Sequence, residues 1–276
     1  MASRRVAHRP SKRLGQNFLV DQRVAEQIVS NVSPGPNDSI LEPGPGHGTL
    51  TQLLQEKAGK VIAIEKDPVL VRDLKQKFAD SQTVIVLEGD FLEMAGSLPS
   101  FNKIVSTPPY YLSSKMVLWL AGTKFDLASI VFQKEFGDRL LASPGTADYG
   151  RLTVAAQRKL NVGRVQVIPR TAFNPRPKVD SILLRITPTS ARTELDEPLF
   201  EELVRGLFNQ RRRLVKSSLR HFLALKFDAE IGKKVLERVS VPDARVYQLS
   251  IDQFENLSLQ LWRIVSDTIT SGQLSA

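Results

Sequence analysis

Short apolar runs alternate with amphipathic stretches along the first two-thirds of the chain. The apolar runs predict five strands, at residues 39–42, 60–67, 83–91, 101–110 and 127–135. Between them, apolar residues recur at helical spacing, as at 49–57 and 68–78. This alternation of strands and helices is typical of a doubly wound α/β sheet.

The pattern changes after Thr187. Before it, two further apolar runs at 164–170 and 181–187 predict an antiparallel edge pair. Residues 188–198 are rich in polar and turn-forming residues, which predicts a linker. Beyond the linker only helical spacing occurs, at 197–208, 211–224, 229–239 and 251–269. We therefore expect an α/β domain with a basic N-terminal arm over 1–188 and a small all-helical domain over 189–276.

The composition excludes several classes of site. The chain has 276 residues, no cysteine and three histidines far apart, so disulfides and cysteine nucleophiles are ruled out and we expect no metal site. No apolar run approaches the ~18 residues of a membrane span, and no apolar segment follows the basic N-terminus as in a signal peptide. We expect a cytoplasmic monomer without a membrane partner; a short mitochondrial presequence is the alternative.

Positive charge is concentrated in three segments. The net charge is +9 and the pI is near 9.8, which favours a polyanionic partner, either nucleic acid or an acidic membrane surface. Five Lys or Arg residues precede the first acidic residue. Residues 151–185 contain eight Lys or Arg and one acidic residue, and residues 203–225 contain six Lys or Arg and no acidic residue. One such cluster would often be a solvated face, but three of them indicate a track for nucleic acid.

A glycine-rich loop, EPGPGHG, spans Glu42–Gly48 between a predicted strand and a predicted helix. Glycines let the backbone approach a ligand closely, and the helix N-terminus offers free amides. The dinucleotide fingerprint requires a third glycine where Thr49 stands. The loop therefore argues against a pyrophosphate and suits a ligand whose amino-acid portion rests on it; a plain glycine-rich turn is the alternative.

Two acidic residues follow at the next strand ends. Glu65 lies about twenty residues beyond the loop, where doubly wound sheets place an acid that receives ribose hydroxyls. Asp90, in EGDF, can accept a hydrogen bond from an adenine amino group while Phe91 packs on the ring. Alone, Glu65 would be a surface charge and Asp90 a helix N-cap. Together with the loop they predict a site for S-adenosylmethionine.

The fourth predicted strand ends in TPPY, Thr107–Tyr110. Two adjacent prolines remove two backbone donors and fix φ, whereas a plain turn more often uses Gly, Asn or Asp. A strand-to-helix turn with a surface tyrosine is one interpretation. A rigid aromatic corner that pins a flat base beside a methyl donor is the other.

At this point the chain resembles a known family, over Lys12–Arg220. Asp/Asn/Ser-x-Pro-Tyr/Phe at this strand end is the signature of amino-methyltransferases. The segments LGQNFLVD, EPGPGHGTLT, EGDF, QKEFGDRLLASPGTADYGRL and FNPRPKVDS together are similar to the small-subunit ribosomal RNA adenine dimethyltransferases, in an archaeal-looking form. The resemblance implies a Rossmann-like class I methyltransferase fold. It also implies methyl transfer from S-adenosylmethionine to N6 of two adjacent adenosines in the 3′-terminal hairpin of small-subunit rRNA, within the immature small ribosomal subunit.

The resemblance also assigns roles to residues. In the cofactor site it places Gln16, Asn17, Leu19, Glu42, Gly44, Gly46, Glu65, Lys66, Asp90, Phe91 and Thr107. In catalysis, the Thr107 side chain and the Pro108 carbonyl orient the amino group, Pro109 stiffens the corner, and Tyr110 and Phe173 stack on the flipped base. In RNA binding it places Lys12, Arg13, Arg211, Arg212, Arg213 and Lys216. If 211–224 is one helix, Arg212 and Lys216 lie four apart on one face.

Thr107 and Pro108 depart from the family, which usually has Asn followed by Leu or Ile. A threonine hydroxyl is shorter than a carboxamide and offers no carbonyl acceptor. We therefore expect the backbone carbonyl to carry more of the orientation of the amine, and the second methyl transfer or one target adenine to be handled poorly.

Three other hypotheses about the function remain open. Thr107 keeps open a non-catalytic nucleic-acid-binding homologue resembling the mitochondrial transcription factors of this superfamily, although the complete cofactor motifs argue against it. A large-subunit rRNA adenine methyltransferase would share the fold, but TADYGRL, FNPRPKVDS and the helical tail favour the small-subunit branch. A DNA adenine methyltransferase would need a sequence-reading domain, of which the sequence shows no sign.

Overall fold

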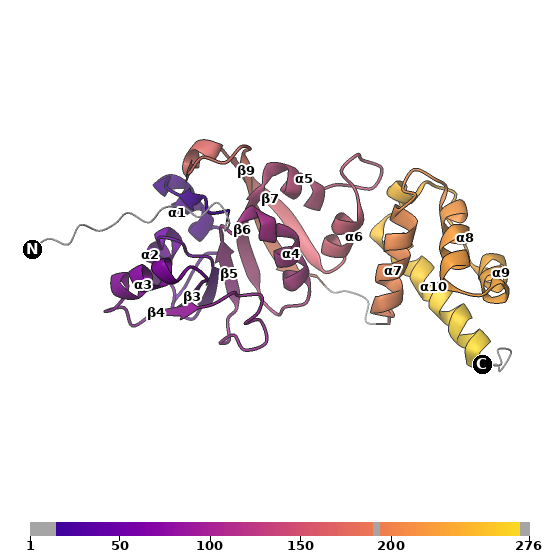
Figure 1. Cartoon of the computed structure of the whole chain (residues 1–276), viewed down its shortest axis with the longest axis horizontal. Coiled ribbons are helices and arrows are strands. Elements are labelled where there is room, and N and C mark those ends of the chain that lie inside the picture. Colours follow the sequence, from indigo (N-terminus) through magenta and orange to yellow (C-terminus); the bar gives the residue numbers. More distant parts are fainter. Residues whose placement is uncertain (1–14, 190–193, 271–276) are drawn as a thin grey trace, which may run out of the picture. The chain divides into compact units, whose positions relative to one another are not determined.

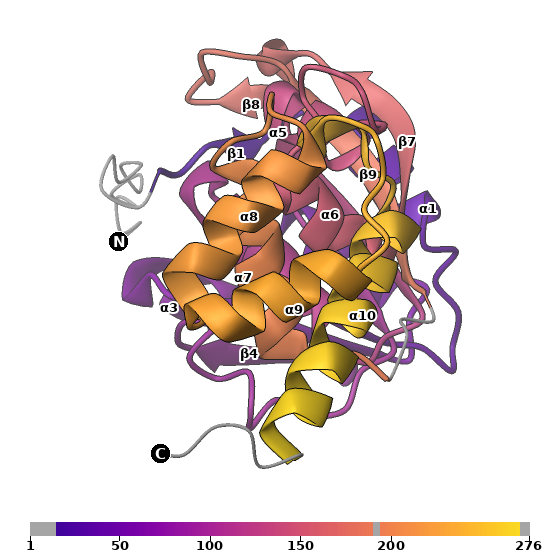
Figure 2. The ribbon, with the colours of Figure 1, turned by 90° about the vertical axis from the view of Figure 1, so that its right-hand side faces the viewer.

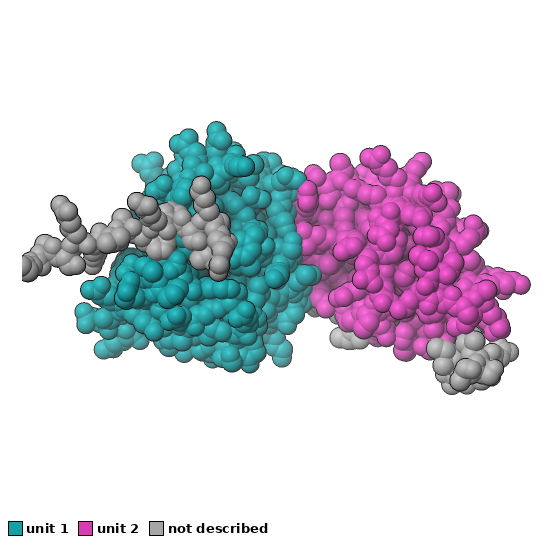
Figure 3. Space-filling view, viewed as in Figure 1, with its two compact units in different colours: residues 1–138, 160–189 teal, residues 139–159, 190–276 magenta. Residues whose placement is uncertain are grey.

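The chain folds into two compact units, which Figure 3 shows in different colours. The computed structural model describes residues 15–189 and 194–270. Unit 1 comprises Met1–Asp138 and Leu160–Thr189, and unit 2 comprises Arg139–Lys159 and Ser190–Ala276. The division differs from the predicted boundary at 188 in one segment, because residues 139–159 pack with the C-terminal helices.

Unit 1 is built on a seven-stranded sheet (Figure 1) in the order β4-β3-β2-β5-β6-β9-β7. The strands are β2 (Ser39–Pro43), β3 (Lys60–Glu65), β4 (Val84–Glu88), β5 (Lys103–Ser106), β6 (Leu127–Gln133), β7 (Leu160–Ile168) and β9 (Ser181–Pro188). Neighbouring strands from β4 to β6 pair in parallel, whereas β9 pairs antiparallel with both β6 and β7. The predicted doubly wound α/β class is confirmed, and only β7 of the predicted late pair lies at the edge.

The strand order reverses between β2 and β5. From β2 the chain moves outward to β3 and β4, and it returns to place β5 on the other side of β2. The loops that leave the carboxyl ends of these two strands therefore diverge, and doubly wound sheets bind ligands in the crevice that forms there. The glycine loop follows β2 and the TPPY corner follows β5, so both stand at this switch point.

The helices of unit 1 are α1 (Gln22–Ser30), α2 (Thr49–Gln55), α3 (Pro68–Lys77), α4 (Ser113–Ala121) and α5 (Lys134–Leu140), which runs into unit 2. Two of these helices, α1 and α3, begin at an aspartate whose side chain caps them. The side chain of Asp67 accepts from the amide of Val69 at 3.0 Å, and Pro68 occupies the first turn of α3. Apolar residues of α1 and α2, among them Ile28 and Leu54, share one buried core with strand residues such as Val131.

Unit 2 is helical (Figure 2), with α6 (Arg151–Gln157), α7 (Glu197–Phe208), α8 (Val215–Lys226), α9 (Ala229–Arg238) and α10 (Ile251–Thr270). Residues 139–159 belong to it for two reasons. Tyr149 is fully buried in its core and donates a hydrogen bond to the carbonyl of Leu249 at 2.8 Å. Arg158, also buried, bonds Glu255 through Nε at 3.0 Å and Glu197 through both terminal nitrogens.

The predicted helix over 211–224 begins four residues later than expected, at Val215. The carbonyls of Arg211 and Arg213 accept from the amides of Tyr247 and Val246, at 3.1 Å each, instead of from residues further along a helix. The three arginines therefore lie in the turn between α7 and α8. The prediction that Arg212 and Lys216 share one helical face was wrong.

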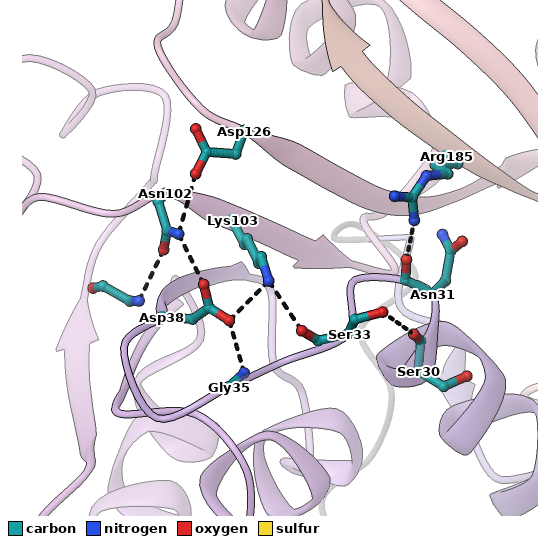
Figure 4. A network of polar contacts seen from close by, with 10 residues as sticks. Ser30, Asn31, Ser33, Gly35, Asp38, Asn102, Lys103, Asp126 and Arg185 are labelled. Carbon is teal, nitrogen blue, oxygen red and sulfur yellow. Dashed lines mark hydrogen bonds and ion pairs between the residues drawn. The ribbon is translucent and has the colours of Figure 1, made fainter.

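A polar network fixes the end of the sheet from which β2 and β5 start (Figure 4). Lys103 Nζ donates to Asp38 Oδ2 at 2.8 Å and to the carbonyl of Ser33 at 3.0 Å. Asn102 donates to Asp38 Oδ1 at 2.8 Å and accepts from the amide of Ser39 at 2.9 Å. Burial opposes ionisation of Asp38, but the bonds from Lys103, Asn102 and the amide of Gly35 outweigh it and lower its pKa. The network joins two strands that carry the site at their opposite ends.

Replacing Lys103 by methionine is expected to lower the free energy of unfolding by about 1–2 kcal/mol at pH 7, because Asp38 loses a charged donor. A carboxyl whose folded pKa is depressed stabilises above its unfolded pKa, and this contribution is lost as pH falls through the folded value. The difference between wild type and Lys103→Met should therefore shrink below about pH 4. Urea unfolding at pH 7 and pH 3 measures it, with Lys115→Met, an exposed lysine on α4, as control. Equal stability of both variants at pH 7 would contradict the role given to Lys103.

Candidate active site

A pocket opens at the carboxyl ends of β2, β3, β4 and β5, within unit 1. Its lining, among the described residues, comes from five places along the chain: Gly15–Leu19, Pro43–His47, Ile64–Lys66, Gly89–Phe91 and Thr107–Leu112, with Phe173 and three further residues. All the predicted catalytic residues line it. So do all the predicted cofactor residues except Glu42.

The glycine loop takes a conformation that requires glycine. Gly44, Gly46 and Gly48 have φ of 69°, 58° and 74°, which side chains disfavour. A Cβ on Gly46 would also come within 2.9 Å of the Phe18 ring. The loop is thus compact against the segment before α1, and the backbone rather than side chains forms this wall of the pocket.

Glu65 organises the loop around its carboxylate. Oε2 accepts from the amide of Gly46 at 3.1 Å, while Oε1 accepts from the amides of Lys66 and Asp67 at 2.8 and 2.9 Å. Burial raises the pKa of Glu65, and these three backbone donors oppose the rise. The carboxylate is therefore held rigidly at the pocket wall, and its remaining lone pairs can accept from hydroxyl groups.

Asp90 accepts two hydrogen bonds at the pocket, and its contact with an adenine amino group stays a prediction. Its Oδ1 accepts from the amide of Leu92 at 3.0 Å, in a turn and not at the start of a helix. Its Oδ2 accepts from Lys66 Nζ at 3.0 Å, and both residues line the pocket. Phe91 is buried and packs edge-on against Trp119, with ring centroids 5.5 Å apart. The carboxylate and the aromatic ring thus form one end of the pocket.

Glu42 lies beneath the loop and is absent from the described pocket lining. Its side chain is 1% exposed, and Oε2 accepts from the Thr51 hydroxyl at 2.6 Å. Burial raises the pKa of Glu42 to about 7, and the bond from Thr51 opposes this rise. Direct contact between Glu42 and a ligand stays a prediction, whereas its bond from Thr51 links the end of β2 to α2.

The segment Gly15–Leu19 forms a strap at the pocket. The strands β1 (Phe18–Leu19) and β8 (Phe173–Asn174) pair antiparallel, with Leu19 opposite Phe173. The Phe18 ring lies 4.2 Å from that of His47, and Gln16 Nε2 donates to Asp67 Oδ2 at 3.1 Å. The strap is therefore fixed at three points, and one amide hydrogen of Gln16 serves Asp67.

The ring of Tyr110, in the TPPY corner, is held by a contact that the sequence does not reveal. The hydroxyls of Tyr110 and Ser181 are 2.7 Å apart, and Ser181 is fully buried. Below the corner, the Ser106 hydroxyl donates to the carbonyl of Pro43 at 2.6 Å, which ties the end of β5 to the glycine loop. Burial raises the pKa of Tyr110. The ring is therefore neutral, anchored and still part of the pocket lining.

Sequence reasoning missed several residues of this site, among them Tyr111, His47 and Ser181. Tyr111 lines the pocket, is 57% exposed and lies against Gly15. Its place directly after Tyr110 was the only signal that could have identified it. The remaining predicted residues, Lys12 and Arg13, lie outside the described residues.

The pocket chemistry fits S-adenosylmethionine. Its two carboxylates, Glu65 and Asp90, suit ligand hydroxyl and amino groups as acceptors and would repel a phosphate. The glycine loop and strap offer backbone groups to an amino-acid portion. Among the residues that the structure describes, no group of three His, Asp or Glu is placed to hold a metal ion. In the same part of the chain, no helix is long and apolar enough to span a membrane.

The sheet order, the glycine loop and the acids at successive strand ends define a class I S-adenosylmethionine-dependent methyltransferase. Comparison with known proteins narrows this class. Residues 7–258 match the ribosomal RNA adenine dimethylase family, and the chain belongs to that family.

Individual relatives agree with this assignment. The chain is 40% identical over 257 residues to the probable ribosomal RNA small subunit methyltransferase A of Thermococcus onnurineus (strain NA1), covering 92% of this chain and 93% of the relative. It is similar in fold to a dimethyladenosine transferase from Plasmodium falciparum, with a TM-score of 0.81, 26% identity and coverage of 90% and 98% of the two chains. The 23S rRNA methyltransferase ErmE is similar with a TM-score of 0.64, 28% identity and coverage of 89% and 99%.

Proposed function

We propose that this enzyme transfers methyl groups from S-adenosylmethionine to N6 of two adjacent adenosines in the 3′-terminal hairpin of small-subunit rRNA, acting on the immature small ribosomal subunit as a cytoplasmic monomer. One observation carries the adenine chemistry: the TPPY corner opens into the pocket whose other walls are the glycine loop, Glu65 and Asp90. The name of the Thermococcus relative supports the small subunit as the substrate.

The residues of the corner orient a poor nucleophile. The exocyclic nitrogen of adenine is weakly nucleophilic because its lone pair is delocalised into the ring. The bound cofactor supplies an activated methyl group. The Pro108 carbonyl and the Thr107 hydroxyl accept from the amino group, so that its lone pair localises and points along the line of transfer. Tyr110 and Phe173 hold the flipped base flat. No strong base is required, because the methylated amine releases its proton readily.

The two main alternatives are less well supported. A non-catalytic nucleic-acid binder would have no use for the rigid carboxylate of Glu65 beside the pocket. A large-subunit methyltransferase is represented by ErmE, whose structure is less similar than that of the dimethyladenosine transferase. Labelled methyl transfer to small and to large ribosomal subunits that lack these methyl groups decides between them. We expect label in the small subunit alone; label only in the large subunit would overturn the proposed substrate.

The turn between α7 and α8, together with the first turn of α8, is the proposed contact with the RNA backbone. Arg212, Arg213 and Lys216 are exposed. Arg211 differs from them, because its guanidinium donates to the carbonyls of Ala147 and Thr146 at 3.0 and 3.2 Å within unit 2. We assign it a bracing role in addition to any RNA contact.

Replacing Arg212 and Lys216 together by alanine is expected to weaken RNA binding and to flatten its salt dependence. Each lost phosphate contact should reduce the slope of log K against log salt by about 0.9. Binding to a small-subunit RNA fragment is measured from 50 to 300 mM salt, and Lys233→Ala, whose side chain is 79% exposed on α9, is the control. An unchanged slope in the double variant would remove this turn from the RNA track.

Thr107→Asn is expected to raise the ratio of dimethyladenosine to monomethyladenosine formed per turnover. A carboxamide reaches further than the threonine hydroxyl and supplies a carbonyl acceptor for the once-methylated amine. Nucleoside analysis of RNA from a time course measures the ratio. If the ratio is the same in variant and wild type, Thr107 does not limit the second transfer.

A further inference from the structure

A lysine outside the pocket donates hydrogen bonds to the backbone of the glycine loop. Lys77, the last residue of α3, donates through Nζ to the carbonyls of His47 and Gly48, both at 3.2 Å. Its amine also lies 5.2 Å from the centroid of the Phe78 ring. Lys77 is not among the described residues that line the pocket. Its contacts therefore act on the loop and not on a ligand.

The contacts of Lys77 add to a set of hydrogen bonds that hold the loop backbone. The amides of Gly44, Gly46 and Gly48 are bonded to Ile64, Glu65 and Pro45, which fixes the direction of the early peptides. At the start of α2, the carbonyl of Gly48 also accepts from the amide of Gln52 at 3.1 Å. An ammonium group has three donors and can serve both carbonyls at once.

Charge strengthens the contact. Lys77 attracts Glu42, the buried carboxyl under the same loop, and this attraction opposes the rise in the pKa of Glu42. The groups that face Glu42 from the surrounding elements are Thr51 on α2, Glu65 on β3 and Lys77 on α3. Lys77 is the one cation among these three, and it attracts the carboxylate of Glu42.

We propose that Lys77 is a positioning residue for the cofactor: it holds the carbonyl side of the glycine loop so that the opposite side keeps the shape that receives the amino-acid end of S-adenosylmethionine. This role rests on the proposed function of the pocket. Nothing in the glycine motif identifies Lys77, because it lies about thirty residues further along the chain, at distances of 30 and 29 positions from its two partners.

The plainer interpretation is a lysine at a helix C-terminus that interacts with the dipole of its own helix. Lys75 tests this interpretation, since it lies in the same last turn of α3 and is exposed. A dipole effect would be shared by both lysines and would appear in thermal stability. A loop effect belongs to Lys77 alone and appears in the loop amides and in ligand affinity.

The experiment compares Lys77→Met, Lys77→Arg and Lys75→Met with wild type. Calorimetry measures the Kd of S-adenosylhomocysteine, and hydrogen exchange without ligand measures the amides of residues 44–49. For Lys77→Met we expect a Kd raised on the order of five- to tenfold and faster exchange confined to the loop. Lys77→Arg should restore much of both, and Lys75→Met should behave as wild type.

Each outcome bears on the proposal. Wild-type affinity and wild-type loop exchange in Lys77→Met would overturn it and leave the methyltransferase function intact. A similar loss in Lys75→Met would favour the dipole interpretation and also overturn it. Failure of the wild-type protein to bind S-adenosylhomocysteine would overturn the function of the pocket, and the role of Lys77 with it.

Discussion

Glu65→Gln is expected to weaken cofactor binding about 100-fold, which corresponds to about 2.7 kcal/mol. The carboxylate accepts from three backbone amides, including that of Gly46 in the glycine loop. A glutamine of the same shape must turn an NH2 group toward one of these donors and loses the charge that strengthens the other bonds. The variant therefore damages the loop and removes the acceptor proposed for the ribose at once.

The sheet supplies a matched control for this variant. Glu88 pairs with Glu65 in the register of β3 and β4, ends its own strand in the same way, and is exposed. Glu88→Gln should bind S-adenosylhomocysteine within about twofold of wild type, since an exposed carboxyl makes a small net contribution. Calorimetry measures both variants, with thermal unfolding as a check on folding. Near-normal affinity in a folded Glu65→Gln variant would show that this carboxylate does not organise the site.

Tyr110→Ala is expected to lower kcat about 100-fold or more while the Kd for S-adenosylhomocysteine changes by less than about threefold. Stacking of an aromatic ring on a base contributes about 1–3 kcal/mol, and loss of orientation at the reacting nitrogen adds to this. The effect should fall on the nucleophile and not on the cofactor, because the corner follows β5 while the carboxylates follow β3 and β4.

Tyr110→Phe distinguishes the role of the aromatic ring from that of the hydroxyl that anchors it. The hydroxyl lies 2.7 Å from that of Ser181 and is thereby engaged within the protein. Phe at this position should retain most of the activity, with a modest loss from the freed ring. Single-turnover methylation of RNA measures all three proteins. If Tyr110→Phe is as inactive as Tyr110→Ala, the hydroxyl takes part in catalysis and the stacking role is insufficient.

The parts of the site that could be predicted are the residues that directly follow, or end, a single predicted strand. The glycine loop, Glu65 and Asp90 each follow an apolar run directly, and a parallel sheet brings such ends to one edge. Thr49, in place of the third glycine of the dinucleotide fingerprint, was enough to argue against a pyrophosphate ligand. For the same reason the seven strands of the larger sheet, and the helices α2 and α3, followed from periodicity.

The parts that could not be predicted depend on contacts between distant segments. Ser181 anchors Tyr110 across 71 positions, and Gln16 gives its amide to Asp67 across 51. The local sequence at Arg211–Arg213 predicts a helix, but the carbonyls of this turn accept hydrogen bonds from the amides of residues 246 and 247. Residues 139–159 joined unit 2 because Tyr149 and Arg158 find their partners there. Local pattern carries no information about any of these pairings.

The central claim is that the TPPY corner and the cofactor pocket together methylate adenine at N6 in small-subunit rRNA. The most direct measurement is incubation of unmethylated immature small subunits with S-adenosylmethionine and either wild type or Tyr110→Ala, followed by complete digestion and mass spectrometry of the nucleosides. We predict N6,N6-dimethyladenosine with wild type and almost none with the variant. Absence of any methylated adenosine with wild type, in protein that binds S-adenosylhomocysteine, would contradict the claim.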